Sequence, residues 1–279
     1  LFFAPKRKIR YFLLLAVLSV TMATITSSAK EKISADKEKT VSLPIIMYHS
    51  VLKDTSFSGK YTVTPKTLEE DLKYLKENGY TSVLSSEILA FDFPEKPVMI
   101  TFDDGYLNNL TNVLPLLEKY DFKAVISVVG KYAEDSSDHN PNYSYLDAGE
   151  IKELIKSGRI EIANHTYNLH SLNGRSGSSI IKGEDKSTYQ AMLYEDLKKA
   201  QTLLEEKACV SPVIFTYPFG SMCESSRSVV ESLGFKISLG CGEKVNILSK
   251  NSSLYCLGRF NRPSGISTKE FMKKACPGI

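Results

Sequence analysis

Two kinds of hydrophobic pattern alternate along residues 43–239. Short apolar runs are typical of buried strands, and the longer amphipathic stretches between them are typical of helices. Strands are expected at 43–50, 81–84, 97–102, 123–129, 159–163, 213–215 and 235–239, and helices at 67–78, 112–120, 147–157, 189–207 and 225–233. Such alternation predicts parallel βαβ units, in a barrel or a doubly wound sheet. The number of repeats favours an α/β fold, a distorted (β/α)7-type barrel.

Capping signals support several of these helices. Thr67 is the expected N-cap of the first, with Glu70 three residues later and Gly79 beyond its end. Asp147 and Glu150 form a second capping-box pattern. Segments 130–146 and 173–188 are polar and rich in Ser, Asp and Gly, so we expect loops at the strand ends, where a barrel carries its substrate-facing residues.

The N-terminus has the pattern of an export signal. Lys6, Arg7, Lys8 and Arg10 precede an uncharged, mostly apolar run over 11–26, and small residues follow at 27–29. This predicts a signal peptide or an uncleaved membrane anchor over 1–29, a charged linker over 30–42 and a catalytic domain over 43–279. The domain is therefore expected outside the cytoplasm, secreted or held at the cell surface, with membrane contact only through the N-terminal segment.

Composition excludes some functions. The chain has 279 residues, 42% of them hydrophobic and 24% charged, with a formal net charge of +3. These values are typical of a soluble globular protein, and no basic stripe with interleaved aromatics suggests a nucleic-acid partner. A monomer is expected. The five cysteines contain no C-x-x-C pair, so a structural zinc site is not indicated; export would permit one or two disulfides of undetermined pairing.

The apolar run 97–102 ends at Asp103, Asp104 and Gly105. Strands of α/β folds present catalytic groups at their carboxyl ends, and glycine frees the next turn. Two adjacent carboxylates leave the strand in different directions, so one can bind a metal while the other accepts a proton. The alternative is an ordinary turn followed by a helix N-cap.

Histidine is rare in this chain. His49 lies at the end of a predicted strand, and His165 and His170 follow another, whereas His139 lies in a polar segment and is interpreted as a surface residue. On a helix His165 and His170 would point ~140° apart, so they can share an ion only if their segment is a loop. Two imidazoles and one carboxylate are a common set of divalent-metal ligands.

Three motifs in the expected order resemble the polysaccharide deacetylases, with a NodB-type domain of carbohydrate esterase family 4. They are Thr101-Phe102-Asp103-Asp104-Gly105, Asn164-His165-Thr166 with His170, and Thr216-Tyr217-Pro218-Phe219-Gly220. The opening segment, Pro44 to Val51, resembles the branch that contains the poly-N-acetylglucosamine deacetylases of biofilm matrices, in which the catalytic acid is an early histidine.

The resemblance implies a role for each matching residue. Asp104, His165 and His170 would hold a divalent metal, most simply zinc, with nickel, cobalt or iron as alternatives. Asp103 would be the general base and His49 the general acid, while Tyr217, Pro218 and Phe219 would contact substrate. The metal would polarise the acetamide carbonyl and activate water directly, without a nucleophilic Ser or Cys.

Some positions depart from the family pattern. Thr216 stands where the third motif usually has Arg, Phe219 where it usually has Tyr, and the chain has neither Trp nor a C-terminal His. Arg259 is the candidate to replace the missing Arg beside Asp103. His49 has a structural alternative, a core histidine on an apolar strand.

The expected function is therefore metal-dependent removal of N-acetyl groups from an N-acetylglucosamine-containing polysaccharide, either peptidoglycan or a poly-N-acetylglucosamine matrix. The alternatives are a glycan-binding barrel with weakened catalysis and an acetyl-xylan esterase.

Overall fold

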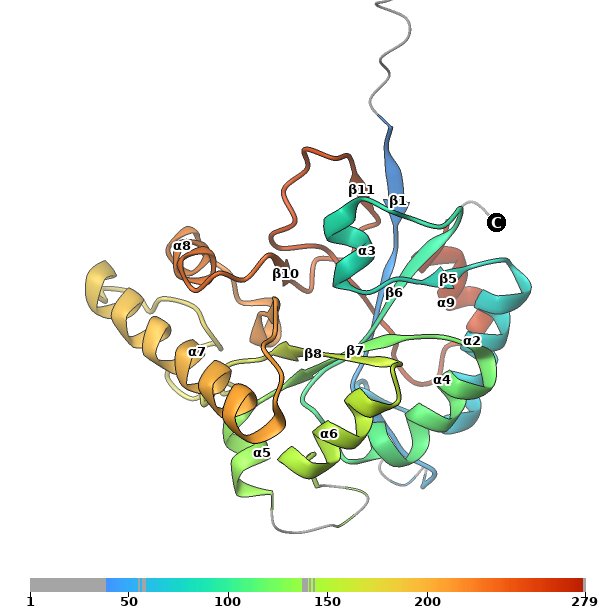
Figure 1. Cartoon of the computed structure of the whole chain (residues 1–279), viewed down its shortest axis with the longest axis horizontal. Helices are drawn as coiled ribbons and strands as arrows, with labels where there is room; N and C mark the ends of the chain where they lie inside the picture. Colours follow the sequence, from blue (N-terminus) through green and yellow to red (C-terminus); the bar gives the residue numbers. More distant parts are fainter. Residues whose placement is uncertain are drawn as a thin grey trace, which may run out of the picture. The chain divides into compact units, whose positions relative to one another are not determined.

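Seven parallel strands form the central sheet of the molecule. A computed structural model describes residues 39–277 except 55, 57, 58, 137–139, 141 and 143. The strand order is β10 (Ile237–Leu239), β9 (Ile214–Thr216), β8 (Ile160–Asn164), β7 (Ala124–Val128), β6 (Pro97–Phe102), β2 (Ile45–Tyr48) and β12 (Phe260–Asn261). The sheet curls into a partial barrel (Figure 1), which confirms the predicted α/β fold. A short strand, β5 (Thr81–Ser82), pairs with β6 beside this path.

Helices cover the outer side of the curled sheet (Figure 1). They are α2 (Pro65–Glu77), α4 (Leu114–Tyr120), α5 (Gly130–Asp135), α6 (Ala148–Lys156), α7 (Lys186–Ala208), α8 (Glu224–Ser232) and α9 (Thr268–Ala275). Helix α3 (Ser85–Ala90) packs through Ile88 in the cluster that contains Met99 and Val125, on the other face of the sheet. A short π-helical segment, η2 (Asn109–Val113), precedes α4, and a 3-10 turn, η3 (Pro218–Gly220), follows β9. Two small ladders complete the fold: β1 (Val41–Leu43) with β11 (Asn246–Leu248), and β3 (Ser50–Val51) with β4 (Thr62–Val63).

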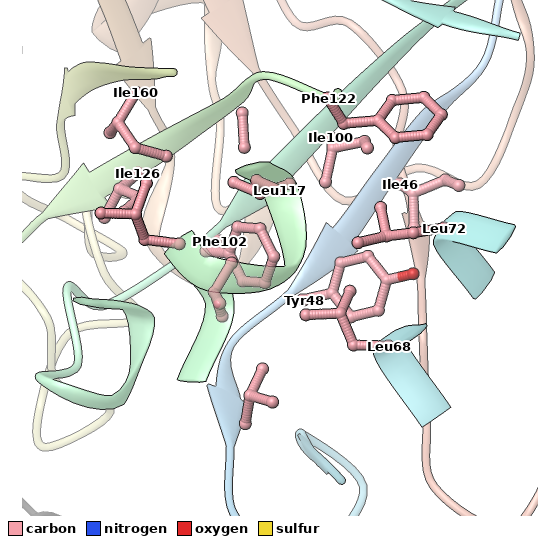
Figure 2. Close-up of a cluster of buried hydrophobic side chains, with 14 of the residues drawn as sticks. Ile46, Tyr48, Leu68, Leu72, Ile100, Phe102, Leu117, Phe122, Ile126 and Ile160 are labelled. Carbon is pink, nitrogen blue, oxygen red and sulfur yellow. The ribbon is translucent and has the colours of Figure 1, made fainter. Parts of the chain in front are cut away.

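The largest core cluster lies between the sheet and its covering helices. All six residues of β6 are buried, as expected for a strand of a parallel sheet that is covered on both faces. Figure 2 shows Ile100 and Phe102 of β6 beside Ile46 and Tyr48 of β2, with Leu68 of α2 packed against them. Full burial of an aliphatic or aromatic side chain contributes about 1.5–3 kcal/mol, so this cluster fixes the strands firmly.

Strand register determines where the polar residues that follow the strands lie. Tyr48 pairs with Phe102, and Phe102 with Ile126, so the carboxyl ends of β2, β6 and β7 lie at the same edge. His49 and Asp103 are the next residues on two of these strands, and the Asp103 N–H donates to the Tyr48 carbonyl at 2.9 Å. The core therefore places the candidate chemistry at one end of the sheet.

Helix capping agrees with the sequence at one helix and differs at another. Asp147 caps α6 and forms the expected reciprocal box with Glu150. The predicted cap of α2 was wrong: Thr64 is the N-cap, and its hydroxyl accepts from the Thr67 N–H at 3.1 Å. The physical reason is Pro65, whose fixed φ and missing N–H suit the first helical position.

Several expected loops and ends also differ. The first part of segment 130–146 is helix α5, and α7 begins at Lys186, inside the expected loop 173–188. The sequence pattern did not predict β11, β12 or α9. Residues 1–38 and His139 lie outside the described residues, so the predicted signal, most of the predicted linker and the surface position of His139 stay predictions. Nowhere in the described part of the chain is a helix long and apolar enough to cross a membrane. The five cysteines, all described, are free thiols.

Candidate active site

The carboxyl edge of the sheet borders a cavity of about 900 Å³. The five predicted catalytic and metal-binding residues all line it: His49, Asp103, Asp104, His165 and His170. They arrive on separate segments, after β2, after β6 and after β8. The sheet thus brings together residues that are as much as 121 positions apart in the sequence (49 and 170).

Asp104, His165 and His170 form a cluster with the composition of a metal site. Each offers one ligand atom, and the three atoms lie within 4.8 Å of one another. Oδ1 of Asp104 is 3.0 Å from Nε2 of His170 and 3.6 Å from Nε2 of His165. This oxygen is buried and makes no hydrogen bond of regular geometry. A buried carboxylate oxygen facing two imidazole nitrogens is the donor set that a divalent cation takes.

The protonation of His165 suits this arrangement. Its Nδ1 lies 2.7 Å from the Thr216 carbonyl oxygen, which can only accept, so Nδ1 carries the proton. The other nitrogen, Nε2, then presents its lone pair toward Asp104. A histidine held through its second nitrogen in this way is the usual form of a metal ligand. Thr216, which stands where the family usually has Arg, thus positions His165 through its backbone.

Charge at the site keeps Asp104 ionised. Burial by itself raises the pKa of this carboxyl, but interaction with the His165 and His170 imidazoles outweighs burial and holds the pKa well below its usual range. For His170, burial opposes the charged form, yet the neighbouring Asp104 carboxylate raises the pKa above its ordinary value.

The turn after β6 directs the two aspartates to different partners. Asp104 has a φ of 73° and Gly105 a φ of 72°, both in the left-handed region. For an aspartate this conformation costs on the order of 1 kcal/mol, and such strain is concentrated at functional sites. A Cβ at position 105 would also lie 3.3 Å from a methyl group of Val128, so glycine suits both the conformation and the space.

Asp103 pairs with Arg259, as the sequence suggested. Both residues are almost fully buried, and the guanidinium donates to Oδ1 at 2.7 Å and to Oδ2 at 2.8 Å. Burial raises the pKa of Asp103, but the charge and hydrogen bonds of Arg259 lower it further than burial raises it, to about 2. Arg259 also donates to the Gly240 carbonyl at 2.8 Å and to the Thr101 hydroxyl at 3.2 Å. It therefore links the segments after β10 and before β12 to the end of β6.

His49 lines the same cavity from the end of β2. Its Nδ1 is buried without a hydrogen-bond partner, and its ring packs on Tyr61 with centroids 4.7 Å apart. Burial lowers the pKa of His49, while the Asp103 and Asp104 carboxylates act in the other direction. Asn109 fixes the backbone by donating to the His49 carbonyl at 3.1 Å. A structural histidine in the core would have its buried ring nitrogens hydrogen-bonded. A buried ring nitrogen without a partner, beside a cavity, favours a role in proton transfer.

The three residues predicted to contact substrate lie in different surroundings. Tyr217 is buried in a core cluster with Phe215 and Tyr189, and Pro218 is also buried; neither side chain lines the cavity. Phe219 lines the cavity, is 44% exposed and packs on His170 with ring centroids 4.7 Å apart. Its φ of 57° turns the chain at this point.

Sequence reasoning missed an aromatic row beside the cluster of Asp104, His165 and His170. Tyr106 stacks on Tyr145 at 5.1 Å and Tyr145 on Tyr132 at 4.3 Å, while the edge of Tyr132 meets His170 at 5.9 Å. The signal available was the tyrosine content of segment 130–146 in a chain without Trp, but only folding brings Tyr132 to His170.

The far wall of the cavity comes from the C-terminal segment, which was also missed. Pro263, Ile266 and Phe271 line it. Arg262 anchors this wall: it is buried and donates to Asp71 of α2 at 2.7 and 3.2 Å. Such a contact between distant segments leaves no local pattern in the sequence.

Comparison with known proteins agrees with this geometry. The family model described as polysaccharide deacetylase matches residues 91–238, just over half of the chain. YxkH of Bacillus subtilis, itself assigned to the polysaccharide deacetylases, is 30% identical over 239 residues, which are 84% of this chain and 76% of that protein. The poly-beta-1,6-N-acetyl-D-glucosamine N-deacetylase of Staphylococcus aureus is 27% identical over 203 residues, 71% of this chain and 67% of that protein.

A solved structure supports the same assignment. The de-N-acetylase of Aggregatibacter actinomycetemcomitans superposes with a TM-score of 0.70 and 25% identity, over 83% of this chain and 100% of that one. The family resemblance inferred from three short motifs is thereby confirmed. The chain belongs to the polysaccharide deacetylase family.

Proposed function

We propose that this chain is a metal-dependent N-deacetylase that acts on polymers of N-acetylglucosamine. The observation that carries the proposal is that the two adjacent carboxylates have different partners. Asp103 is bound by Arg259, and Asp104 faces His165 and His170. Two aspartates in such different surroundings suit two different tasks, proton acceptance and metal binding. The S. aureus relative, named for poly-beta-1,6-N-acetyl-D-glucosamine, supports the substrate class.

Asp104, His165 and His170 are the residues that would hold the cation, and zinc is the first choice for this ligand set. When bound, a divalent cation polarises the acetamide carbonyl and lowers the pKa of water. Nickel, cobalt or iron can occupy the same ligands, and metal analysis of the purified protein would identify the ion.

The chain's own residues supply the proton transfers. With a pKa of about 2, Asp103 is ionised at neutral pH and accepts the proton of the attacking water, while Arg259 fixes both of its oxygens. His49 donates a proton to the amine nitrogen as the bond between carbonyl carbon and nitrogen breaks. The products are acetate and a free amine on the sugar. Phe219 is the one predicted substrate contact that this proposal keeps.

The position of Arg259 bears on the alternatives. A base without its charged partner would be more consistent with a glycan-binding barrel than with an enzyme, but Arg259 supplies that partner from another segment. An acetyl-xylan esterase would use the same groups on an ester, so substrate preference separates it from the proposal.

Acetate release from a panel of substrates tests the proposed function. The panel is β-1,6-linked N-acetylglucosamine oligomers, peptidoglycan glycan strands and acetylated xylan. Release from one of the two N-acetylated substrates at a rate well above that from xylan would support an N-deacetylase. Release from xylan alone would replace it with the esterase, and release from none by a metal-loaded protein would favour the binding barrel.

We also propose that the protein works outside the cytoplasm, with residues 1–29 as signal peptide or anchor and a linker from residue 30 to the catalytic domain, which begins with β1 at Val41. The basic and apolar pattern of the N-terminus supports this, together with the polysaccharide named for the relative. N-terminal sequencing of protein recovered from the cell surface or medium would show whether the segment is removed, and protein found only in the cytoplasm would contradict the proposal.

A further inference from the structure

The two histidines of the metal cluster lie on a loop that needs external support. His165 follows directly after β8, and residues 165–172 contain no helix or strand. Because the histidines are five positions apart, a regular helix would point them ~140° apart, so a particular loop shape is required. Within the loop, the Leu169 N–H donates to the Thr166 hydroxyl at 3.3 Å, a long hydrogen bond. The loop therefore depends on its neighbours for its shape.

Asp196, near the middle of helix α7, provides that support from one side. Its Oδ1 accepts the Tyr167 N–H at 2.8 Å, and its Oδ2 accepts the Asn168 N–H at 2.9 Å. One carboxylate thus binds two successive backbone donors that lie between the two histidines. Hydrogen bonds to an ionised acceptor are about twice as strong as neutral ones.

Helix α7 can hold Asp196 rigidly. The helix is 23 residues long, and its Leu193, Leu197 and Ala200 are buried. Asn164, the residue before His165, donates to the Leu197 carbonyl at 3.1 Å, so strand β8 is attached to the same stretch of helix.

The other side of the loop is held by helix α5. The Gly130 N–H donates to the Thr166 carbonyl at 2.9 Å, and the Lys131 N–H donates to the Tyr167 carbonyl at 2.8 Å. Tyr167 is consequently held at both ends, its N–H by Asp196 and its C=O by Lys131. Two side chains of α5 also contact the loop: the Tyr132 hydroxyl donates to the His170 carbonyl at 3.3 Å, and the Tyr167 hydroxyl donates to Glu134. Asp196 differs from them because its one carboxylate accepts from two backbone N–H groups between the histidines.

We propose that Asp196 is a positioning residue for the metal site: it fixes the loop so that His165 and His170 converge on Asp104. Asp196 does not line the cavity. Its two backbone hydrogen bonds are to N–H groups that lie between the two histidine ligands. The inference rests on the proposed metal site and adds a determinant of metal affinity located on α7. Changes to such supporting residues typically weaken metal affinity by about 10–100-fold.

The test is a metal-affinity measurement on the full chain, with zinc in competition with a chromophoric chelator. In Asp196→Asn the amide keeps one acceptor but turns an NH₂ toward the second backbone N–H, while Asp196→Ala removes both acceptors. Glu195→Gln is the matched control, because it removes a neighbouring charge from the exposed face of the same helix. We expect about 10-fold weaker binding for Asp196→Asn, a larger loss for Asp196→Ala and an unchanged affinity for the control.

A second readout separates positioning from general stability. The visible absorption of the cobalt-substituted protein reports ligand geometry, and it should differ between Asp196→Asn and wild type but not between the control and wild type. Wild-type affinity and an unaltered cobalt spectrum in both Asp196 variants would overturn the inference. So would failure of both variants to fold without metal, since Asp196 would then hold the fold and not the loop. If wild type itself binds no metal, the proposed function fails instead.

Discussion

Arg259 is the residue whose replacement tests the site most sharply. Its side chain is fully buried, and both of its terminal nitrogens donate to Asp103. Arg259→Met keeps a long unbranched side chain but removes the charge and every donor. Asp103 is then left as a buried carboxylate without its cation.

The expected loss of stability follows from the buried pair. Removing one partner of a buried ion pair typically costs about 3–5 kcal/mol. The pKa gives a second measure: a fall of the Asp103 pKa from the ordinary 3.8 to about 2 corresponds to about 2 kcal/mol at neutral pH. Because the folded pKa lies below the unfolded one, this stabilisation is present above about pH 4 and is lost as the pH falls through about 2.

Catalysis should respond through the same carboxylate. Without Arg259, burial of Asp103 persists while the two largest interactions that lower its pKa are gone, so the pKa rises. The acid limb of the activity profile that belongs to Asp103 should therefore move to higher pH. The turnover rate should also fall, because neither carboxylate oxygen is held in place.

Arg262→Met is the matched control. Arg262 is as buried as Arg259 and is also bidentate to a carboxylate, that of Asp71, but Asp71 does not line the cavity. Urea unfolding should show a loss of similar size in both variants. A shift of the acid limb in acetate release should appear only in Arg259→Met. A wild-type pH profile and wild-type turnover in Arg259→Met would refute the role of the pair.

The remaining predictions concern the other groups at the site. Asp104→Ala should abolish zinc binding measured by chelator competition, whereas Asp103→Asn should keep the metal and lose acetate release; equal activity of Asp103→Asn and wild type would exclude Asp103 as the base. His49→Ala should slow acetate release without displacing metal, and loss of metal from this variant would contradict its role as acid. Because burial lowers the pKa of His49 and the acid must be protonated, the wild-type rate should decline as pH rises, with a midpoint no higher than that of ordinary imidazole; the same alkaline limb in His49→Ala would assign it to another group.

The sequence predicted those parts of the site that follow regular strands. Asp103, Asp104 and His165 come directly after apolar runs, and the parallel arrangement inferred from alternating patterns places such residues at one edge. The requirement that His165 and His170 share a loop was likewise a consequence of helical geometry, and the structure has a loop there.

The remainder depended on contacts between distant segments. Tyr217 lies in a motif beside cavity-lining Phe219, yet its side chain points into the core, and no local pattern distinguishes the two directions. Asp196 is half-buried beside the buried stripe of α7, and no local pattern shows that its carboxylate accepts from the N–H groups of Tyr167 and Asn168. The predicted cap of α2 was wrong because Thr64 and Thr67 both precede apolar positions, and Pro65 at the first helical position favours Thr64.

Reconstitution of acetate release by metal tests the central claim most directly. The protein would be stripped with a chelator, dialysed and assayed on β-1,6-linked N-acetylglucosamine oligomers before and after one equivalent of zinc, cobalt or nickel. The account predicts no release from the stripped protein and recovery of release with one of these ions, in wild type but not in Asp104→Ala. Full acetate release from protein shown to be free of metal would contradict it.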